Sequence, residues 1–98
     1  MKLETGMPVA IAAVPADRIV DVDVREDLRQ GIEPFHRIME AQATVGVGGI
    51  LRVRAIFEPV PLYMVLGNHG FTHWTERFAD DDWRVWFHLV DPNQELRK

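Results

Sequence analysis

The stretch of the sequence with the clearest chemical potential reads GIEPFHRIMEA, at positions 31–41. The proline after Glu33 fits the first position of a helix, where its missing N–H would be unpaired anyway. Free backbone N–H groups and the helix dipole favour an anion at such a helix start. The sequence therefore predicts a candidate site for a small anionic ligand, made by Arg25, Arg29, Glu33 and His36. The favoured interpretation is nevertheless that Glu33 only caps the helix and that the two arginines are its solvated counter-charges.

Three histidines form a second candidate site. If a hairpin places His73 directly opposite His88, both imidazoles point to the same face of a sheet, and His69 lies at the same end. Imidazoles in such an arrangement can hold zinc, copper or nickel. Because no carboxylate is evident beside them and a cross-strand histidine pair needs no metal, a polar surface pair is the favoured interpretation. We therefore expect neither a metal nor another cofactor.

The residue types that are missing exclude several kinds of chemistry. The chain has no cysteine, which excludes disulfides, thiolate catalysis and cysteine-ligated zinc. It also has no serine, its threonines lack an evident base and orienting group, and no glycine-rich loop has a phosphate-binding spacing. The formal charge of −4 and the scattered basic residues argue against a nucleic-acid partner. An enzyme is therefore less expected than a binding protein.

The amino-terminal stretch MPVAIAAV is mildly apolar, but Pro8 and Pro15 break it. It is too short to span a membrane and is a poor match to a secretory signal. We therefore expect a cytoplasmic protein without a membrane partner. Residues 1–18 show no sustained period and are expected to be an extension that docks late or stays mobile.

Hydrophobic periodicity predicts the elements that must position the candidate residues. Valines alternate with charged residues over positions 19–25, and apolar residues alternate with arginines over 50–57, so both stretches are expected to be half-buried strands. Apolar residues at three- and four-residue spacing over 34–45 predict an amphipathic helix. The segment 58–70 frames a helix of about two turns, and the polar stretch 25–33 is interpreted as a connection.

A hairpin over residues 71–89 completes the predicted sheet. Asp80 and Asp81 are expected to form its two-residue loop, with a positive φ at Asp81. We choose the register that puts the large apolar side chains on one face, because a one-residue slip would scatter them. The residues on that face are then Trp74, Phe78, Trp83, Val85 and Phe87.

The element order β-α-β-α-β-β leaves one face of the sheet open, because right-handed crossovers put both helices on the same side. An outward tryptophan among arginines is typical of binding surfaces. The candidate partner-binding residues on this face are Arg52, Arg54, Arg84 and Trp86. We expect the open face to bind a protein partner or a second copy of the chain, or to be covered by the chain's own segment 8–16. Simple solvation is the alternative.

From about Ile19 to Leu89 the chain resembles an uncharacterised bacterial family, a domain of unknown function in the TusA/SirA-like superfamily of sulfur-carrier proteins. The resemblance rests on DVRE at the end of the first strand, EPFHRIMEA at the first helix, FEPVPLYMVL at the second, and GFTHW with DDDWRVWF at the hairpin. It implies an α+β two-layer sandwich, with a four-stranded mixed sheet in the order 1-2-4-3 and two helices on one face.

The resemblance also bears on the chemistry of the first helix. Active members of the superfamily carry a C-P-x-P motif there, whose cysteine accepts sulfur as a persulfide. In this sequence the cysteine position falls on Glu33, the first proline is Pro34, and the second proline position falls on His36. Because a carboxylate cannot hold a persulfide, sulfurtransferase activity by this mechanism is excluded.

These observations predict a non-catalytic binding or adaptor module over residues 19–90, between an extension (1–18) and a tail (91–98). Relatives of the resembled family often occur beside or fused to hemerythrin-like and nitrogen-oxide-related proteins, which implies a link to redox or nitrogen-oxide metabolism. The alternative is a protein, an enzyme included, that binds a small anion at the first helix or a metal at the histidines. A weaker alternative is an enzyme subunit whose active site needs a partner.

Overall fold

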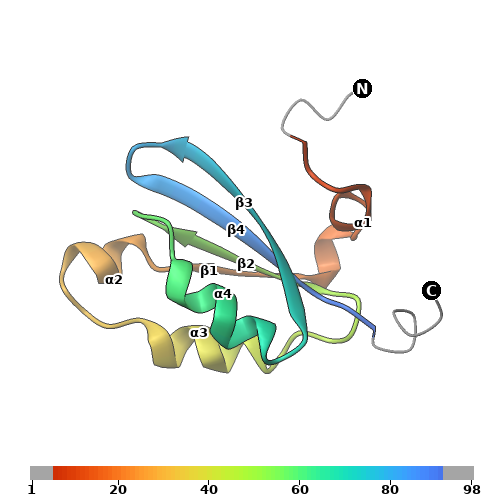
Figure 1. The fold of residues 1–98 in the computed structure, drawn as a ribbon. Helices are drawn as coiled ribbons and strands as arrows, with labels where there is room; N and C mark the ends of the chain where they lie inside the picture. Colours follow the sequence, from red (N-terminus) through yellow and green to blue (C-terminus); the bar gives the residue numbers. More distant parts are fainter. Residues whose placement is uncertain (1–5, 92–98) are drawn as a thin grey trace.

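Four stretches of alternating apolar and polar residues form a four-stranded sheet (Figure 1). In the computed structural model, which describes residues 6–91, the strands are β1 (Ile19–Asp23), β2 (Ile50–Ala55), β3 (Phe71–Ala79) and β4 (Asp82–Leu89). Their order across the sheet is β1-β2-β4-β3, with β1 parallel to β2 and the other neighbours antiparallel. The predicted mixed sheet and its strand order are confirmed.

Two predicted helices, α3 (Phe35–Gln42) and α4 (Val60–Gly67), pack against one face of this sheet. Ile38 of α3 and Leu62 and Leu66 of α4 are buried in the main core. The sheet contributes Val22, Leu51, Val53, Val85 and Phe87 to the same core. Since each helix has only eight residues, its stability comes from this burial more than from helix propensity.

A further helix, α2 (Arg25–Arg29), lies in the stretch that the sequence predicts to be a polar connection. Glu26 and Asp27 stand in its first turn and Arg29 in its last turn, which is the charge order that the helix dipole favours. Leu28 packs against the main core. The prediction of a connection without a helix is wrong, because a helix this short has too few residues to show an apolar period.

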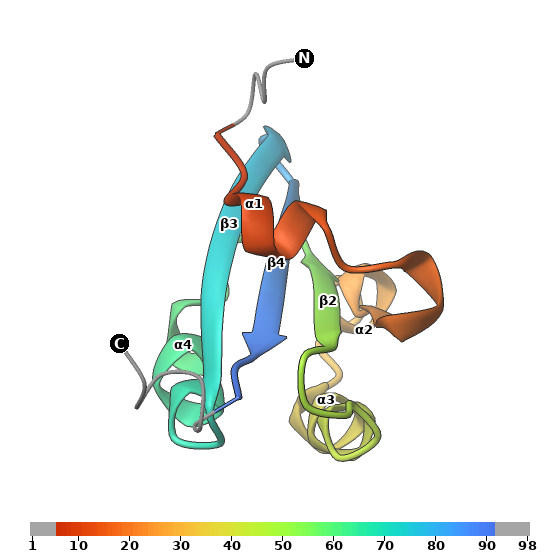
Figure 2. The same cartoon turned by 90° about the vertical axis from the view of Figure 1, so that its right-hand side faces the viewer.

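The sheet face opposite α3 and α4 is partly covered by the amino-terminal segment (Figure 2). Here α1 (Val9–Ala12) presents the buried side chain of Ile11 to Ile50 and Trp86. Trp74 packs beside Trp86, with ring centroids 5.3 Å apart. Because Trp86 is only 7% exposed, the prediction of an outward tryptophan on an open face is wrong, whereas docking of the chain's own segment is confirmed.

The part of the predicted extension that the structure describes is therefore not separate from the domain. After α1, a 3-10 turn over Ala16–Arg18 leads directly into β1. Val14 and Ile19 pack against the same small apolar cluster as α1. The rest of the predicted extension, residues 1–5, and nearly all of the predicted tail, residues 92–98, lie outside the described residues.

The β3–β4 hairpin contains a β-bulge that changes which side chains face each other. Ala79 pairs with Asp82 as predicted, but the register shifts by one residue between Arg77 and Ala79. Trp74 therefore lies opposite Trp86, one residue away from its predicted partner. Because side chains alternate between the two faces, this shift reverses the predicted facing of the β3 residues before the bulge.

The loop of the hairpin also differs from the prediction in its backbone. No residue other than glycine has a positive φ among those the structure describes, so the expected positive φ at Asp81 is wrong. The bulge adds an unpaired residue, Phe78, to β3 beside the loop, and such a residue changes the local twist that the loop must accommodate.

Replacing Ile11 by alanine tests the docking of α1. Because Ile11 is 6% exposed, loss of its side chain should lower the free energy of unfolding by about 2 kcal/mol and uncover Trp86. The measurement is urea denaturation followed by tryptophan fluorescence, whose native emission should shift to longer wavelength. Val9→Ala, at a position of the same helix that is 74% exposed, is the matched control. Unchanged stability and emission in Ile11→Ala would contradict the docking.

Candidate functional site

The start of α3 is built around the carboxylate of Glu33. Its Oε2 atom accepts a hydrogen bond from the backbone N–H of Phe35 at 2.7 Å, and Pro34 precedes the first helical residue. The carboxylate thus satisfies one of the free N–H groups of the helix start and faces the positive end of the helix dipole. Of the two interpretations of Glu33, this geometry supports the helix cap.

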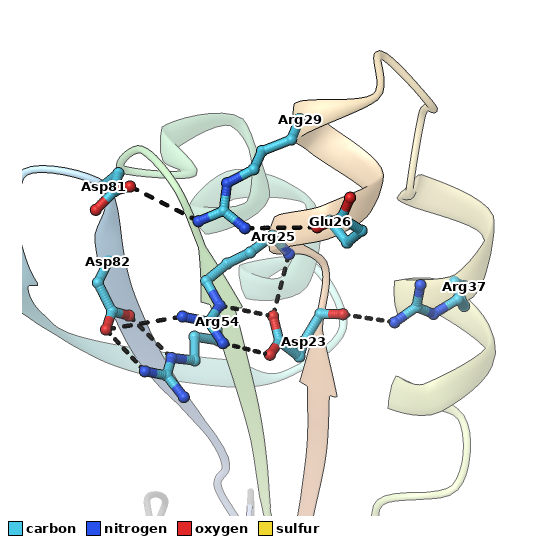
Figure 3. Close-up of polar contacts among 8 residues, drawn as sticks. All are labelled: Asp23, Arg25, Glu26, Arg29, Arg37, Arg54, Asp81 and Asp82. Carbon is cyan, nitrogen blue, oxygen red and sulfur yellow. Dashed lines mark hydrogen bonds and ion pairs between the residues drawn. The ribbon is translucent and has the colours of Figure 1, made fainter.

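The two arginines of the candidate anion site point away from the start of α3 (Figure 3). The side chain of Arg25 donates two hydrogen bonds to Asp23, of 3.0 and 2.9 Å. Arg29 lies 3.6 Å from the carboxylates of both Glu26 and Asp81. Both arginines belong to α2 and face carboxylates of β1, of α2 itself and of the hairpin turn.

His36, the fourth residue of that candidate site, is also separate from Glu33. Its Nε2 atom lies 3.0 Å from a carboxylate oxygen of Glu40, one turn along α3, and its side chain is 87% exposed. The structure thus does not bring the four predicted residues together into one anion site.

Beside Glu33 the structure has an apolar groove of about 410 Å³. It lies between the α2–α3 connection, the first turn of α3 and the segment that leads into α4. Three of its side chains, Ile32, Phe35 and Phe57, are 42–53% exposed. The prolines that line it are Pro34, Pro59 and Pro61.

Sequence reasoning did not find this groove. The second strand is predicted to extend over 50–57, but β2 ends at Ala55, and Phe57 lies beyond it and is 51% exposed. Ile32 falls in a connection where no periodicity could assign it to a face. The signal that could have revealed the groove is the placement of both residues in connections that run into prolines, Pro34 and Pro59.

A network of arginine–aspartate pairs joins β1, β2 and β4 to α2 (Figure 3). Arg54 donates two hydrogen bonds to Asp82, of 2.9 and 2.7 Å, just as Arg25 does to Asp23. Arg25 also lies 3.9 Å from Asp82, which connects the two pairs. Hydrogen bonds from Arg54 and Arg25 hold the pKa of Asp82 and Asp23, respectively, below the ordinary aspartate value.

Arg37 extends this network to α3. It donates a 2.7 Å hydrogen bond to the backbone carbonyl of Asp23 and contacts both carboxylate oxygens of Asp27 at 2.7 Å. The end of β1, the helix α2 and the helix α3 are therefore joined by one side chain. The network fixes the positions of these elements. The N–H groups that form it are already hydrogen-bonded within the protein and are not free to bind a ligand.

The sheet face under α1 has an apolar half and a polar half. The polar half forms a cleft of about 270 Å³, lined by Val22 and by charged side chains. Three of the predicted partner-binding residues, Arg52, Arg54 and Arg84, lie together there, whereas the fourth, Trp86, lies in the apolar half beneath α1. We refer to this feature as the arginine cleft.

The three histidines lie apart. His73 pairs with Phe87 and His88 pairs with Thr72, so the two imidazoles are on opposite faces of the sheet. The exposed His69 lies in the connection between α4 and β3. The predicted opposition of His73 and His88 is wrong, because the bulge shifts the register by one residue. Within the described part of the chain, no group of three or more His, Cys, Asp or Glu side chains could hold a metal ion.

His73 instead stacks on Tyr63 of α4, with ring centroids 3.8 Å apart and an interplanar angle of 4°. The hydroxyl of Tyr63 is within 2.6 Å of Thr75 Oγ1 and donates to Glu58 at 2.9 Å. Burial raises the pKa of Tyr63, which keeps its hydroxyl protonated at neutral pH. These contacts tie α4 to β3 and provide no activated nucleophile.

Comparison with known proteins gives one match. A family model described as "Uncharacterized conserved protein (DUF2249)" matches residues 21–88, more than half of the chain. The matched span includes the groove and the arginine cleft and leaves out α1. No curated protein and no solved structure matches the chain. None of the helices in the described residues has the length and apolar character to cross a membrane.

Asp82→Asn tests the contribution of the arginine–aspartate network to stability. Because the pKa of Asp82 in the folded protein lies below its ordinary value of 3.8, its carboxylate stabilises the fold above that pH, and the contribution is lost as the pH falls through the folded pKa. We expect Asp82→Asn to lower the free energy of unfolding at neutral pH by about 1 kcal/mol, a small value because the pair is partly exposed.

The measurement is urea denaturation of both proteins from neutral pH down to about pH 3, where the difference between them should shrink. Asp80→Asn is the matched control, because Asp80 pairs with Arg77 in the same hairpin but its side chain is 99% exposed. A difference between Asp82→Asn and the unsubstituted protein that did not change with pH would contradict the assignment.

Proposed function

The chain belongs to the DUF2249 family of uncharacterized conserved proteins, and for this member we propose a non-catalytic binding function. The apolar groove beside Glu33 receives an apolar segment of a protein partner. The observation that carries this proposal is the exposure of Ile32, Phe35 and Phe57 around one groove, since contiguous exposed apolar surface marks interaction sites in soluble proteins.

A protein segment fits the groove better than a small polar metabolite does. Sites for small molecules combine apolar walls with a few polar groups that fix the orientation of the ligand. Among the side chains that line this groove only Glu33 is polar, and its carboxylate is bound to the backbone of α3. Two apolar side chains of α4 outside the groove, Val60 and Met64, are also exposed, by 53% and 74%.

The same set of side chains argues against catalysis in the groove. General acid–base or nucleophilic chemistry needs a reactive group within hydrogen-bond reach of a second functional group. Glu33 is the single ionisable side chain that lines the groove, and its only hydrogen bond in the described structure is to a backbone N–H. The carboxylate of Glu33 therefore stabilises the start of α3, and a ligand in the groove would contact mainly its apolar walls.

The resemblance to TusA/SirA-like sulfur carriers supports this view of the site. On the C-P-x-P pattern, Glu33 stands where active members carry the sulfur-bearing cysteine, and the groove lies directly beside it. We infer that the start of this helix, which carries the reactive cysteine in the sulfur carriers, serves here as a binding surface with Glu33 in place of that cysteine. A cytoplasmic location, inferred from the sequence, and a link to redox or nitrogen-oxide metabolism, implied by the family resemblance, belong to the same proposal.

Site-specific photo-crosslinking in the source cells tests the proposed function. A photoreactive amino acid at Ile32, on the groove, should give an adduct with one defined protein. The same amino acid at Val47 is the matched control, because both positions are aliphatic and 53% exposed and Val47 lies in the loop before β2. Phe35→Ser in the Ile32 background should reduce the adduct by about tenfold, the loss expected when a phenylalanine no longer contributes its apolar contact.

Thermal unfolding of the Phe35→Ser protein shows whether the fold is kept, so that loss of the adduct can be assigned to the groove. Equal adducts from Ile32 and Val47 would contradict the proposal, as would an Ile32 adduct that Phe35→Ser does not reduce. If the adduct forms only between two copies of the chain, the groove binds a second copy and not a different protein.

A further inference from the structure

The arginine cleft contains one arginine that has no carboxylate of its own. Arg52 is bound to Asp21 and Arg54 to Asp82, each through two hydrogen bonds. The side chain of Arg84, which lies opposite Arg54 on the neighbouring strand, makes no hydrogen bond or ion pair among the described residues, and its Nε atom is buried without a partner. Its charge acts on Asp82 without direct contact and helps to lower the pKa of that carboxyl. Because a buried donor without an acceptor costs free energy, an anion in this cleft would satisfy a group that the fold leaves unpaired.

The guanidinium of Arg84 is nevertheless held in place. Its central carbon lies 4.1 Å from the centroid of the Phe78 ring, and Phe78 is the bulge residue of β3. Stacking on an aromatic ring fixes the plane of a guanidinium and leaves its N–H donors directed outward along its edges. A planar guanidinium with free edge donors matches a carboxylate, which accepts two parallel hydrogen bonds from it.

The charge of the cleft also indicates which anion fits. The arginines of the cleft and its attached ion pairs are Arg25, Arg52, Arg54 and Arg84, and the aspartates are Asp21, Asp23 and Asp82. Four positive and three negative charges leave a formal charge of +1 for this set, which does not include Glu76 on the neighbouring strand β3. One singly charged carboxylate would neutralise it, whereas a doubly charged phosphate or sulfate would leave a negative charge beside three aspartates.

We propose that the arginine cleft binds a carboxylate, with the guanidinium of Arg84 as its anchor. The cleft volume of about 270 Å³ has room for a small organic acid, since a water molecule occupies about 30 Å³. The carboxylate belongs either to such an acid or to an acidic side chain of a partner. The cleft opens on the opposite face of the sheet from the apolar groove, so this inference does not depend on the proposed function.

Glu76 is a carboxylate of the protein itself that could pair with Arg84 in place of a ligand. It lies directly across from Arg84 on β3, yet it forms no ion pair with Arg84 among the described residues. If Glu76 competes with an external carboxylate, Glu76→Gln should tighten binding of the ligand. Removal of this negative charge would also strengthen the general attraction of anions, so a site at Arg84 is distinguished by the saturable shift of the Arg84 signal and by the loss of affinity in Arg84→Gln.

The experiment is a titration of the isotope-labelled protein with sodium acetate at constant ionic strength, followed by NMR of the arginine Nε–H groups. We expect a saturable shift of the Arg84 Nε–H signal, a loss of affinity of about tenfold or more in Arg84→Gln, and tighter binding in Glu76→Gln. Arg77→Gln is the matched control, because Arg77 stacks on Trp83 in the same hairpin but pairs with the exposed Asp80; it should bind acetate as the unsubstituted protein does.

Two further titrations identify the source of the carboxylate. Succinate that binds more tightly than acetate, with a short aspartate-containing peptide no better than acetate, assigns the site to small acids. The reverse order assigns it to an acidic segment of a partner. A shift of the Arg84 signal that does not saturate, or equal losses of affinity in Arg84→Gln and Arg77→Gln at unchanged thermal stability, would overturn the proposal.

Discussion

Neighbouring side chains of a strand point to opposite faces of a sheet, so the pairing of β3 with β4 decides what each residue of the hairpin meets. The bulge at Phe78 sets that pairing. It places Trp74 against Trp86 beneath α1, and it places Thr75 where its hydroxyl reaches Tyr63 of α4. Contacts on both faces of the sheet thus depend on one extra residue beside the hairpin turn.

The charge pairs at the end of the sheet have a different role from the core. Exposed and partly exposed ion pairs contribute little to the free energy of unfolding, and burial of apolar side chains contributes most of it. What the pairs supply is position, because Arg54, Arg25 and Arg37 connect three strands and two helices. By binding Asp82, Arg54 also takes a carboxylate whose pKa the charge of Arg84 helps to lower. The unpaired state of Arg84 is therefore a consequence of how the strands are held together.

Elements with a clear period could be predicted from the sequence. The valines of β1, the alternating apolar and arginine residues of β2 and the apolar face of α3 are such patterns, and the structure has all three elements. The short helices α1 and α2 could not be predicted, because each has only one turn or little more and is held by tertiary contacts of Ile11 and Leu28. The hairpin register failed because the choice rested on gathering apolar residues on one face, and a bulge allows both faces of β3 to carry aromatic side chains.

The candidate site shows the same limits. Capping by Glu33 could be predicted, since it depends on a proline and on residues adjacent in the sequence. The groove could not, because its walls come from connections whose position is set only when α2, α3 and α4 pack. The lone state of Arg84 could not be predicted either, since it depends on which carboxylates the register and the network bring near it. Local chemistry could be predicted from the sequence, whereas chemistry that depends on the register of the hairpin could not.

The two candidate binding features share one strand. Val53 of β2 lines the apolar groove, whereas its neighbours Arg52 and Arg54 line the arginine cleft on the other face. β2 is paired on both sides, with β1 and with β4, and its apolar side chains are fully buried, so it is among the least deformable parts of the molecule. Coupling between distant sites is best supported by an element with two discrete arrangements, and a strand that is paired on both sides and buried is a poor candidate for such an element. The sheet therefore separates the two features, and the two proposed ligands, an apolar segment and a carboxylate, are expected to bind independently of each other.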